Sequence, residues 1–184
     1  MTGASPRPTA RESAADAAAR VPMLGSCASP PVAPTLVIGI GNPSRGDDAL
    51  GPEFLERLRA LRLPDVELVA DFQLQVEHVL DFAGRDEVIV VDADASCAAP
   101  FRFDPVRPCA DRSITTHALS PAALLDVYAR VVAAPPPPTW LLAIRGHAFE
   151  LGAPMTAAAS ANLDAAIAML SARLPRTQGV ADPR

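Results

Sequence analysis

Short apolar runs alternate along the chain with segments in which apolar residues recur every three or four positions. The runs at residues 35–40, 66–71, 87–94 and 139–144 are dominated by valine, leucine and isoleucine, which predicts buried β-strands. Residues 101–106 alternate apolar and polar side chains, as a half-exposed strand does. Helical spacing predicts helices over residues 49–63, 74–83 and 156–174, the first ended by Pro64 and the second by Gly84.

One further helix is indicated by its starting residues. Ser120 is a good N-cap and Pro121 suits the first helical position, so we expect a helix from there to about Val132. A run of prolines at residues 135–138 then forms a stiff connector to the next strand. Strand and helix alternate throughout, which predicts an α/β protein with three α/β/α layers and a mostly parallel twisted sheet. Ligands of such sheets bind beyond the carboxyl ends of the strands.

The chain divides by composition into three parts. Residues 1–34 are rich in alanine, proline, serine and threonine and contain few large apolar side chains, which predicts a flexible extension. Residues 35–174 carry all the periodic segments and are expected to form a single α/β domain. Residues 175–184 are expected to be a loose tail.

Charge and composition exclude several classes of function. The 184 residues have a formal net charge of −5 and a pI near 5.1, which argues against nucleic acid as a partner. No apolar run reaches the roughly 18 residues of a membrane span, and no secretory signal is recognised at the start. The three cysteines, Cys27, Cys97 and Cys109, form no C-x-x-C pair, so we expect no disulfide framework and a cytoplasmic location.

The loop after the first strand, GIGNPSRGDDALG at residues 39–51, partly matches the dinucleotide-binding fingerprint G-x-G-x-x-G. Gly39 and Gly41 occupy the first two positions, but Ser44 occupies the third. Pro43 lacks an N–H that a phosphate could accept from. Asp71, after the second strand, stands where a ribose-binding acid would. A nucleotide-binding module that uses this glycine loop therefore stays open as an alternative.

The same loop ends in two adjacent acids, Asp47 and Asp48. Helix capping is the commonest reason for an aspartate at a helix start, but a single residue occupies the cap. We therefore expect one of the two carboxylates to cap the helix and the other to project into the crevice beyond the strands. A negative charge there disfavours a pyrophosphate ligand.

Further candidate ligands follow other strands. Asp92 lies at the end of the third strand, and Asp94 points the same way by strand alternation. His117 lies in a polar segment just before Ser120, and His147 follows the last strand, so the two histidines compete for the same role.

Asp48, Asp92 and His117 could meet at one rim of the sheet. Two carboxylates and one imidazole suit Ni, Zn or a similar divalent ion and leave coordination positions open. The third histidine, His78, is expected at the surface or boundary of its helix. The sequence contains neither H-E-x-x-H nor G-x-S-x-G, and nothing marks Cys109 and His117 as a nucleophile and base.

Four segments, in order and at plausible spacing, resemble the [NiFe]-hydrogenase maturation endopeptidases. They are the opening loop GIGNPSRGDDALG, the segment DFQLQVEHVLDF at residues 71–82, the strand VIVVDAD with its acids, and the histidine segment TTHALSPAALL. The resemblance extends over residues 35–174. Two features depart from it: the family's Gly-rich stretch after the second strand is replaced here by Phe72-Gln73-Leu74-Gln75, and residues 1–34 lie outside the shared pattern.

The resemblance implies an α/β/α peptidase that removes a short C-terminal extension from the hydrogenase large-subunit precursor once nickel is in place. It also implies that Asp48, Asp92 and His117 contact that nickel, which the precursor holds and for which Zn or Cd could substitute. Asp48 stands where some members have glutamate. A nickel-checking chaperone that binds the loaded precursor without cleaving it stays open as a second alternative.

Overall fold

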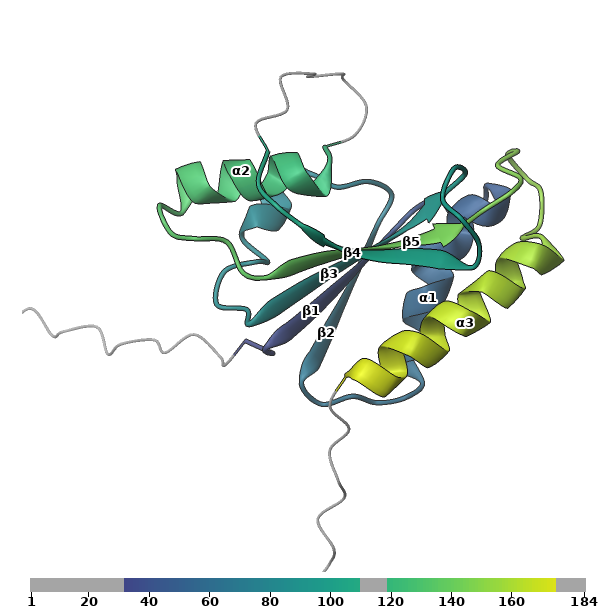
Figure 1. Cartoon of the computed structure of the whole chain (residues 1–184), viewed down its shortest axis with the longest axis horizontal. Helices are drawn as coiled ribbons and strands as arrows, with labels where there is room; N and C mark the ends of the chain where they lie inside the picture. The colour runs from purple at the N-terminus through teal and green to yellow at the C-terminus, as the bar shows by residue number, and fades with distance from the viewer. Residues whose placement is uncertain (1–31, 110–118, 175–184) are drawn as a thin grey trace, which may run out of the picture. The chain divides into compact units, whose positions relative to one another are not determined.

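The computed structural model describes residues 32–109 and 119–174, which form a five-stranded sheet in the order β2-β1-β3-β5-β4 (Figure 1). Four neighbouring strands run parallel: β2 (Val66–Asp71), β1 (Thr35–Ile40), β3 (Glu87–Asp94) and β5 (Thr139–Arg145). The fifth strand, β4 (Phe101–Val106), pairs antiparallel with β5 at one edge. All five predicted strands are confirmed.

Helices cover both faces of this sheet, which confirms the three-layer α/β/α fold. The helices α1 (Leu50–Arg59) and α3 (Ala157–Arg173) pack on one face, and α2 (Pro121–Val131) lies on the other (Figure 1). Two short 3-10 helices complete the layers: η1 (Gly46–Ala49) leads into α1, and η2 (Val76–Val79) packs beside α2. None of these helices in the described residues is long and apolar enough to cross a bilayer.

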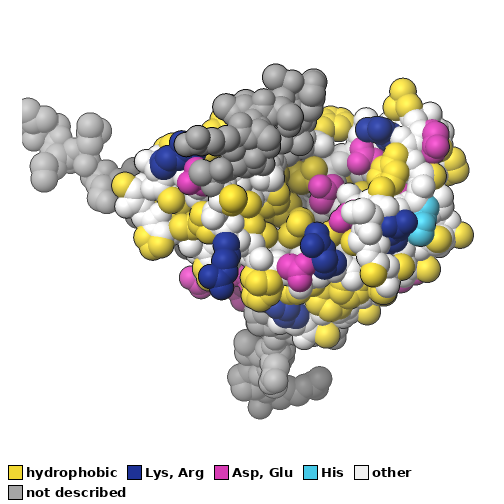
Figure 2. Space-filling model, turned by 45° about the horizontal axis from the view of Figure 1, so that its top comes forward, with side chains coloured by type: hydrophobic (Ala, Val, Ile, Leu, Met, Phe, Trp, Pro, Cys, Tyr) yellow, Lys and Arg dark blue, Asp and Glu magenta, His cyan; other side chains and the backbone are white. Residues whose placement is uncertain are grey.

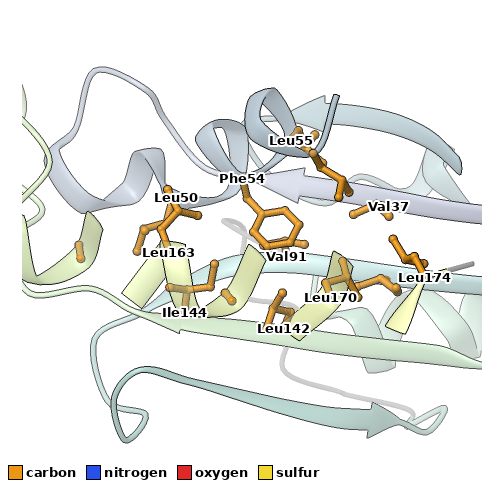
Figure 3. Packing of buried hydrophobic residues seen from close by; sticks show 14 residues of the cluster. Val37, Leu50, Phe54, Leu55, Val91, Leu142, Ile144, Leu163, Leu170 and Leu174 are labelled. Atoms are coloured by element: carbon orange, nitrogen blue, oxygen red, sulfur yellow. The ribbon is translucent and has the colours of Figure 1, made fainter. Parts of the chain in front are cut away.

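Two apolar cores lie on the two faces of the sheet because side chains alternate along each strand. In β3, Ile89 and Val91 face α1 and α3, whereas Val88 and Val90 face α2. Phe54 of α1 is fully buried at the centre of the first core, among side chains from the sheet and α3 (Figure 3). Burial of a side chain of that size contributes roughly 2–3 kcal/mol, so this packing fixes where α1 begins relative to β1.

The ends of the helices follow local capping chemistry where a capping side chain is present. The hydroxyl of Ser120 accepts a hydrogen bond from the Ala123 N–H at 3.2 Å, and Thr156 caps α3 in the same way through Ala159 at 3.1 Å. Both helices match the predicted ranges. The predicted helix over residues 49–63 is too long, since α1 ends at Arg59, before Pro64 is reached.

The predicted helix over residues 74–83 is wrong, and only the four residues of η2 are helical there. Leu74, Val79 and Phe82 are buried, whereas Val76 and Leu80 are more than half exposed. The buried positions are therefore spaced by five and three residues, which does not form the continuous stripe of an α-helix. The segment is apolar in composition but lacks the periodicity of an α-helix.

The two ends of the chain, residues 1–31 and 175–184, and the internal residues 110–118 lie outside the described residues. The expected division into an extension, a domain of residues 35–174 and a tail is consequently still a prediction.

Candidate functional site

A pocket of about 460 Å³ opens beyond the carboxyl ends of β1 and β3. The pocket lies at the topological switch point of the sheet. There the next two strands of the chain lie on opposite sides of β1, with β2 on one side and β3 on the other. Two carboxylates, Asp48 and Asp92, line the pocket together with one cation, Arg45. The remaining walls come from the ends of β1 and β3, the segment after β2 and the start of α2, with Ile40, Gly41, Phe72, Gln73, Leu74, Val90, Leu119, Ser120 and Pro121.

The glycines that frame the pocket let two backbones approach closely. A Cβ built on Gly51 would lie 2.1 Å from the carbonyl oxygen of Ile40, and one on Gly39 would lie 2.5 Å from the carbonyl oxygen of Gly51. Gly41 has φ +139°, and a Cβ there would lie 1.9 Å from the carbonyl oxygen of Asp48. These glycines therefore seat α1 against β1 and fold the loop over the Asp48 backbone.

The two adjacent acids of this loop have different roles. Asp47 is fully buried, and its carboxylate accepts hydrogen bonds from the N–H groups of His147, Ala148 and Thr156 and from the Thr156 hydroxyl, at 2.7–3.0 Å. Burial by itself would raise the pKa of Asp47, but the hydrogen bonds together hold it below its usual value. Asp47 thus ties η1 to the segment between β5 and α3.

The expectation that one of the two acids caps the following helix is wrong. Neither η1 nor α1 has a side-chain cap hydrogen bond at its N-terminus. The partners of Asp47 lie about 100 residues away in sequence, so spacing along the chain could not reveal them. The second half of the expectation is confirmed, because Asp48 lines the pocket beyond the strands.

Asp48 also accepts a hydrogen bond from the N–H of Asn42 at 3.1 Å. This contact closes the loop on its own carboxylate. A phosphate-binding loop offers such N–H groups to its ligand instead. The contact therefore counts against the nucleotide-binding alternative.

Asp92 is the most perturbed acid of the pocket. Burial raises its pKa to about 6, the hydrogen bond from the Ala93 N–H at 2.8 Å opposes this rise, and the negative charges of Asp48 and Asp94 add to it. The negative charge of Asp48 therefore disfavours ionisation of Asp92. A bound cation would relieve the repulsion between them.

Asp94 has a structural role. Its carboxylate accepts hydrogen bonds from the N–H and hydroxyl of Ser96 and from the N–H of Cys97, at 2.6–3.1 Å. These hydrogen bonds, those from Ser96 first, lower the pKa of Asp94. The residue stabilises the turn after β3, and it does not line the pocket. The choice of Asp92 over Asp94 as the pocket acid is thereby supported.

The three histidines differ in how they relate to the pocket. His117 lies outside the described residues, although Leu119, two positions later, lines the pocket. His147 is exposed and is absent from the pocket lining, and its backbone N–H binds Asp47. His78, predicted at the surface or boundary of its helix, is instead buried.

The burial of His78 has a local cause. Its Nδ1 accepts a hydrogen bond from the Gln75 N–H at 2.9 Å, and its Nε2 lies 3.5 Å from a carboxylate oxygen of Asp71. Asp71 thus holds the segment after β2 through His78, a role that the sequence does not predict.

Arg45 lines the pocket although it is not among the residues predicted for the site. Its position three residues before Asp48 in the same loop could have indicated this.

Within residues 32–109 and 119–174, no group of three potential metal-binding side chains is found. Asp48 and Asp92 could offer carboxylate oxygens to a cation, but two side chains are too few for a closed structural metal site. On the face shown in Figure 2, acidic and basic side chains are interspersed with apolar ones.

Comparison with known proteins gives matches among solved structures alone. The chain matches no family model and no curated protein sequence. Of the solved structures, the hydrogenase maturating endopeptidase HybD from Escherichia coli is 27% identical, with a TM-score of 0.58 over 76% of this chain and 91% of that one. An endopeptidase from Escherichia coli is 26% identical, with a TM-score of 0.56 over 75% and 90% of the two chains.

A third match extends the likeness in fold. The [NiFe] hydrogenase maturation protease HycI from Thermococcus kodakarensis is 22% identical, with a TM-score of 0.59 over 76% of this chain and 91% of that one. The matched chains are thus covered almost completely.

Proposed function

We propose that this chain, a peptidase with the fold of the hydrogenase maturation endopeptidases, removes the C-terminal extension of a [NiFe]-hydrogenase large-subunit precursor after nickel insertion. The observation that carries the proposal is the pair of coupled carboxylates, Asp48 and Asp92, in one pocket at the switch point of the sheet. The reaction takes place in the cytoplasm in this proposal, consistent with the absence of a disulfide at Cys97 and Cys109.

Recognition of the nickel follows from the charges in the pocket. The negative charge of Asp48 adds to the raised pKa of Asp92, and a divalent cation would offset that repulsion. In this proposal the precursor brings that cation with its own thiolates already bound. His117, which lies outside the described residues, is the third contact in this proposal, as the resemblance to the maturation endopeptidases implies. Zn or Cd held in the same precursor site would be recognised by the same ligands.

Hydrolysis then requires water to add to the scissile carbonyl, the C–N bond to break, and a proton to reach the departing amine. The carboxylates Asp48 and Asp92 can serve this step in two ways: by docking the ion so that it polarises the carbonyl, or by accepting the proton of the attacking water. In either case the acids act in their ionised form.

The test is the mass of the precursor C-terminus after incubation with the chain, with and without nickel in the precursor. We expect shortening of the nickel-loaded precursor alone, and no shortening by Asp48→Asn, Asp92→Asn or His117→Ala. Normal processing by all three variants would refute the proposal. Binding of the loaded precursor without any change of mass would identify a nickel-checking chaperone instead.

A further inference from the structure

The two edges of the sheet differ in how they are protected from pairing with another strand. The β4 edge contains two charged residues, Arg102 and Asp104, followed by Pro105, features that discourage strand addition. The β2 edge contains no proline. Its one charged residue before the strand end, Glu67, is paired with Arg85 at 2.7 Å.

Among the described residues, β2 pairs with β1 only, so its outer N–H and C=O groups face away from the sheet. Figure 1 shows β2 at this edge, and α1 contacts both β1 and β2. The edge offers about 20 Å of backbone, the length of six extended residues.

Two hollows lie along β2 beside α1. The one at the carboxyl end of the strand, of about 310 Å³, is lined by Gly41, Pro43, Pro52, Ala70, Asp71 and Phe72. It shares Gly41 and Phe72 with the candidate site, so it continues directly from that pocket. Phe72 is 68% exposed and therefore offers an apolar surface between the two.

The second hollow, of about 340 Å³, lies at the amino end of β2, and two arginines, Arg59 and Arg62, are among its lining residues. Arg59 pairs with Glu56, whereas Arg62 forms no ion pair within the described residues. Glu67 also lines this hollow, but its carboxylate is bound to Arg85. The amino end of the edge thus presents positive charge to an anionic ligand.

We propose that the segment of the precursor beyond the scissile bond binds along the β2 edge as an added antiparallel strand, with its terminal carboxylate at Arg59 and Arg62. This inference rests on the proposed function, because it takes the cleaved C-terminal extension as the occupant. Strand addition of this kind draws affinity from main-chain hydrogen bonds and specificity from alternate side chains placed in hollows.

The direction of the added strand follows from the position of the site. In the proposed function the scissile bond is placed in the pocket lined by Asp48 and Asp92, which the residues just after the carboxyl end of β2 also line. The residues after that bond must then run toward the amino end of β2, which is the antiparallel direction. The free carboxylate at the end of the extension arrives where Arg62 is located, so the charges are complementary.

The first test is kinetic and uses the nickel-loaded precursor as substrate. We expect Arg62→Gln to raise KM about fivefold with kcat unchanged, as loss of a charge-assisted hydrogen bond would. Arg130→Gln, on α2 at the opposite face of the sheet, is the matched control and should change neither constant. Thermal denaturation of both variants checks that the fold is intact.

The second test uses a synthetic peptide with the sequence of the extension as a competitive inhibitor. The peptide with a free C-terminal acid should inhibit about five times better than its carboxamide. This preference should disappear in Arg62→Gln. Non-additivity of the two changes is the signature of a direct contact.

The third test measures amide hydrogen exchange of β2 with the precursor and with the mature subunit. Protection of the β2 amides by the precursor, but not by the mature subunit, supports the inference. Cleavage that proceeds with no effect of Arg62→Gln or of amidation and no protection of β2 overturns it, while the proposed function stands. Absence of cleavage altogether refutes the proposed function instead. Protection of β2 that grows with enzyme concentration without precursor identifies a second copy of the chain as occupant and overturns the inference.

Discussion

The carboxylate of Asp47 accepts two hydrogen bonds from Thr156, one from its N–H at 2.7 Å and one from its hydroxyl at 2.9 Å. Thr156 is also the N-cap of α3, so this contact joins the loop after β1 to the last helix of the domain. The neighbouring Asp48 makes no such contact and lines the pocket. Of these two adjacent aspartates, Asp47 therefore holds distant segments together, whereas Asp48 faces the pocket.

Asp47→Asn is expected to destabilise the fold by roughly 2–4 kcal/mol, because an amide nitrogen replaces an acceptor oxygen and leaves buried donors unpaired. For a chain of this size the melting temperature should fall by roughly 5–15 °C. Asp48→Asn is the matched control, since its remaining oxygen can still accept from Asn42. Thermal denaturation that gives equal shifts for the two variants would contradict this division of roles.

Asp92→Asn is expected to stabilise the folded chain near neutral pH. The pKa of Asp92 is about 6 in the fold, above its ordinary value of 3.8, so the folded state binds the proton more tightly than the unfolded state does. Protonated Asp92 therefore contributes stability that is fully present below about pH 4 and is lost as the pH rises through about 6. The variant should gain roughly 1–3 kcal/mol at pH 7.5.

Urea denaturation at two pH values measures this gain. The advantage of Asp92→Asn over the parent should shrink to nearly nothing at pH 4. An advantage that is the same at both pH values would show that charge is not its origin. Loss of processing together with a gain in stability would mark Asp92 as a residue retained for function.

The cleavage rate should fall as pH drops below about 6. Asp92 must be ionised to contact a cation, and its pKa is near that value. Under subsaturating substrate, the rate should decrease about tenfold for each further pH unit. Mass spectrometry of the precursor between pH 5 and 8 measures this profile, with circular dichroism confirming that the fold persists. A rate that stays constant down to pH 5 would rule out Asp92 as an ionised participant.

Gly51→Ala is expected to destabilise the fold although alanine favours helices by about 1 kcal/mol over glycine. The added Cβ would lie 2.1 Å from the Ile40 carbonyl oxygen, so α1 would have to move away from β1. Because α1 follows directly after Asp48, we expect processing to decrease as well. An increase in melting temperature would show that helix propensity outweighs the close packing.

Several parts of the fold could be read from the sequence because their causes are local. The strands are short apolar runs, and α2 and α3 begin at Ser120 and Thr156, whose side chains cap them. The meeting of Asp48 and Asp92 in one pocket could also be predicted, since Asp48 follows β1 and Asp92 lies near the carboxyl end of the parallel strand β3. The helix predicted after β2 is wrong because the apolar residues of that segment do not form a helical stripe.

Tertiary structure alone decided the roles that depend on distant partners. Asp47 and Asp48 are indistinguishable by type and position, and only contacts with residues about 100 positions away make one of them structural. The identity of β2 as an open edge follows from strand order. Local sequence determines which elements form, because capping and periodicity act over a few residues; packing determines which polar groups remain available for chemistry.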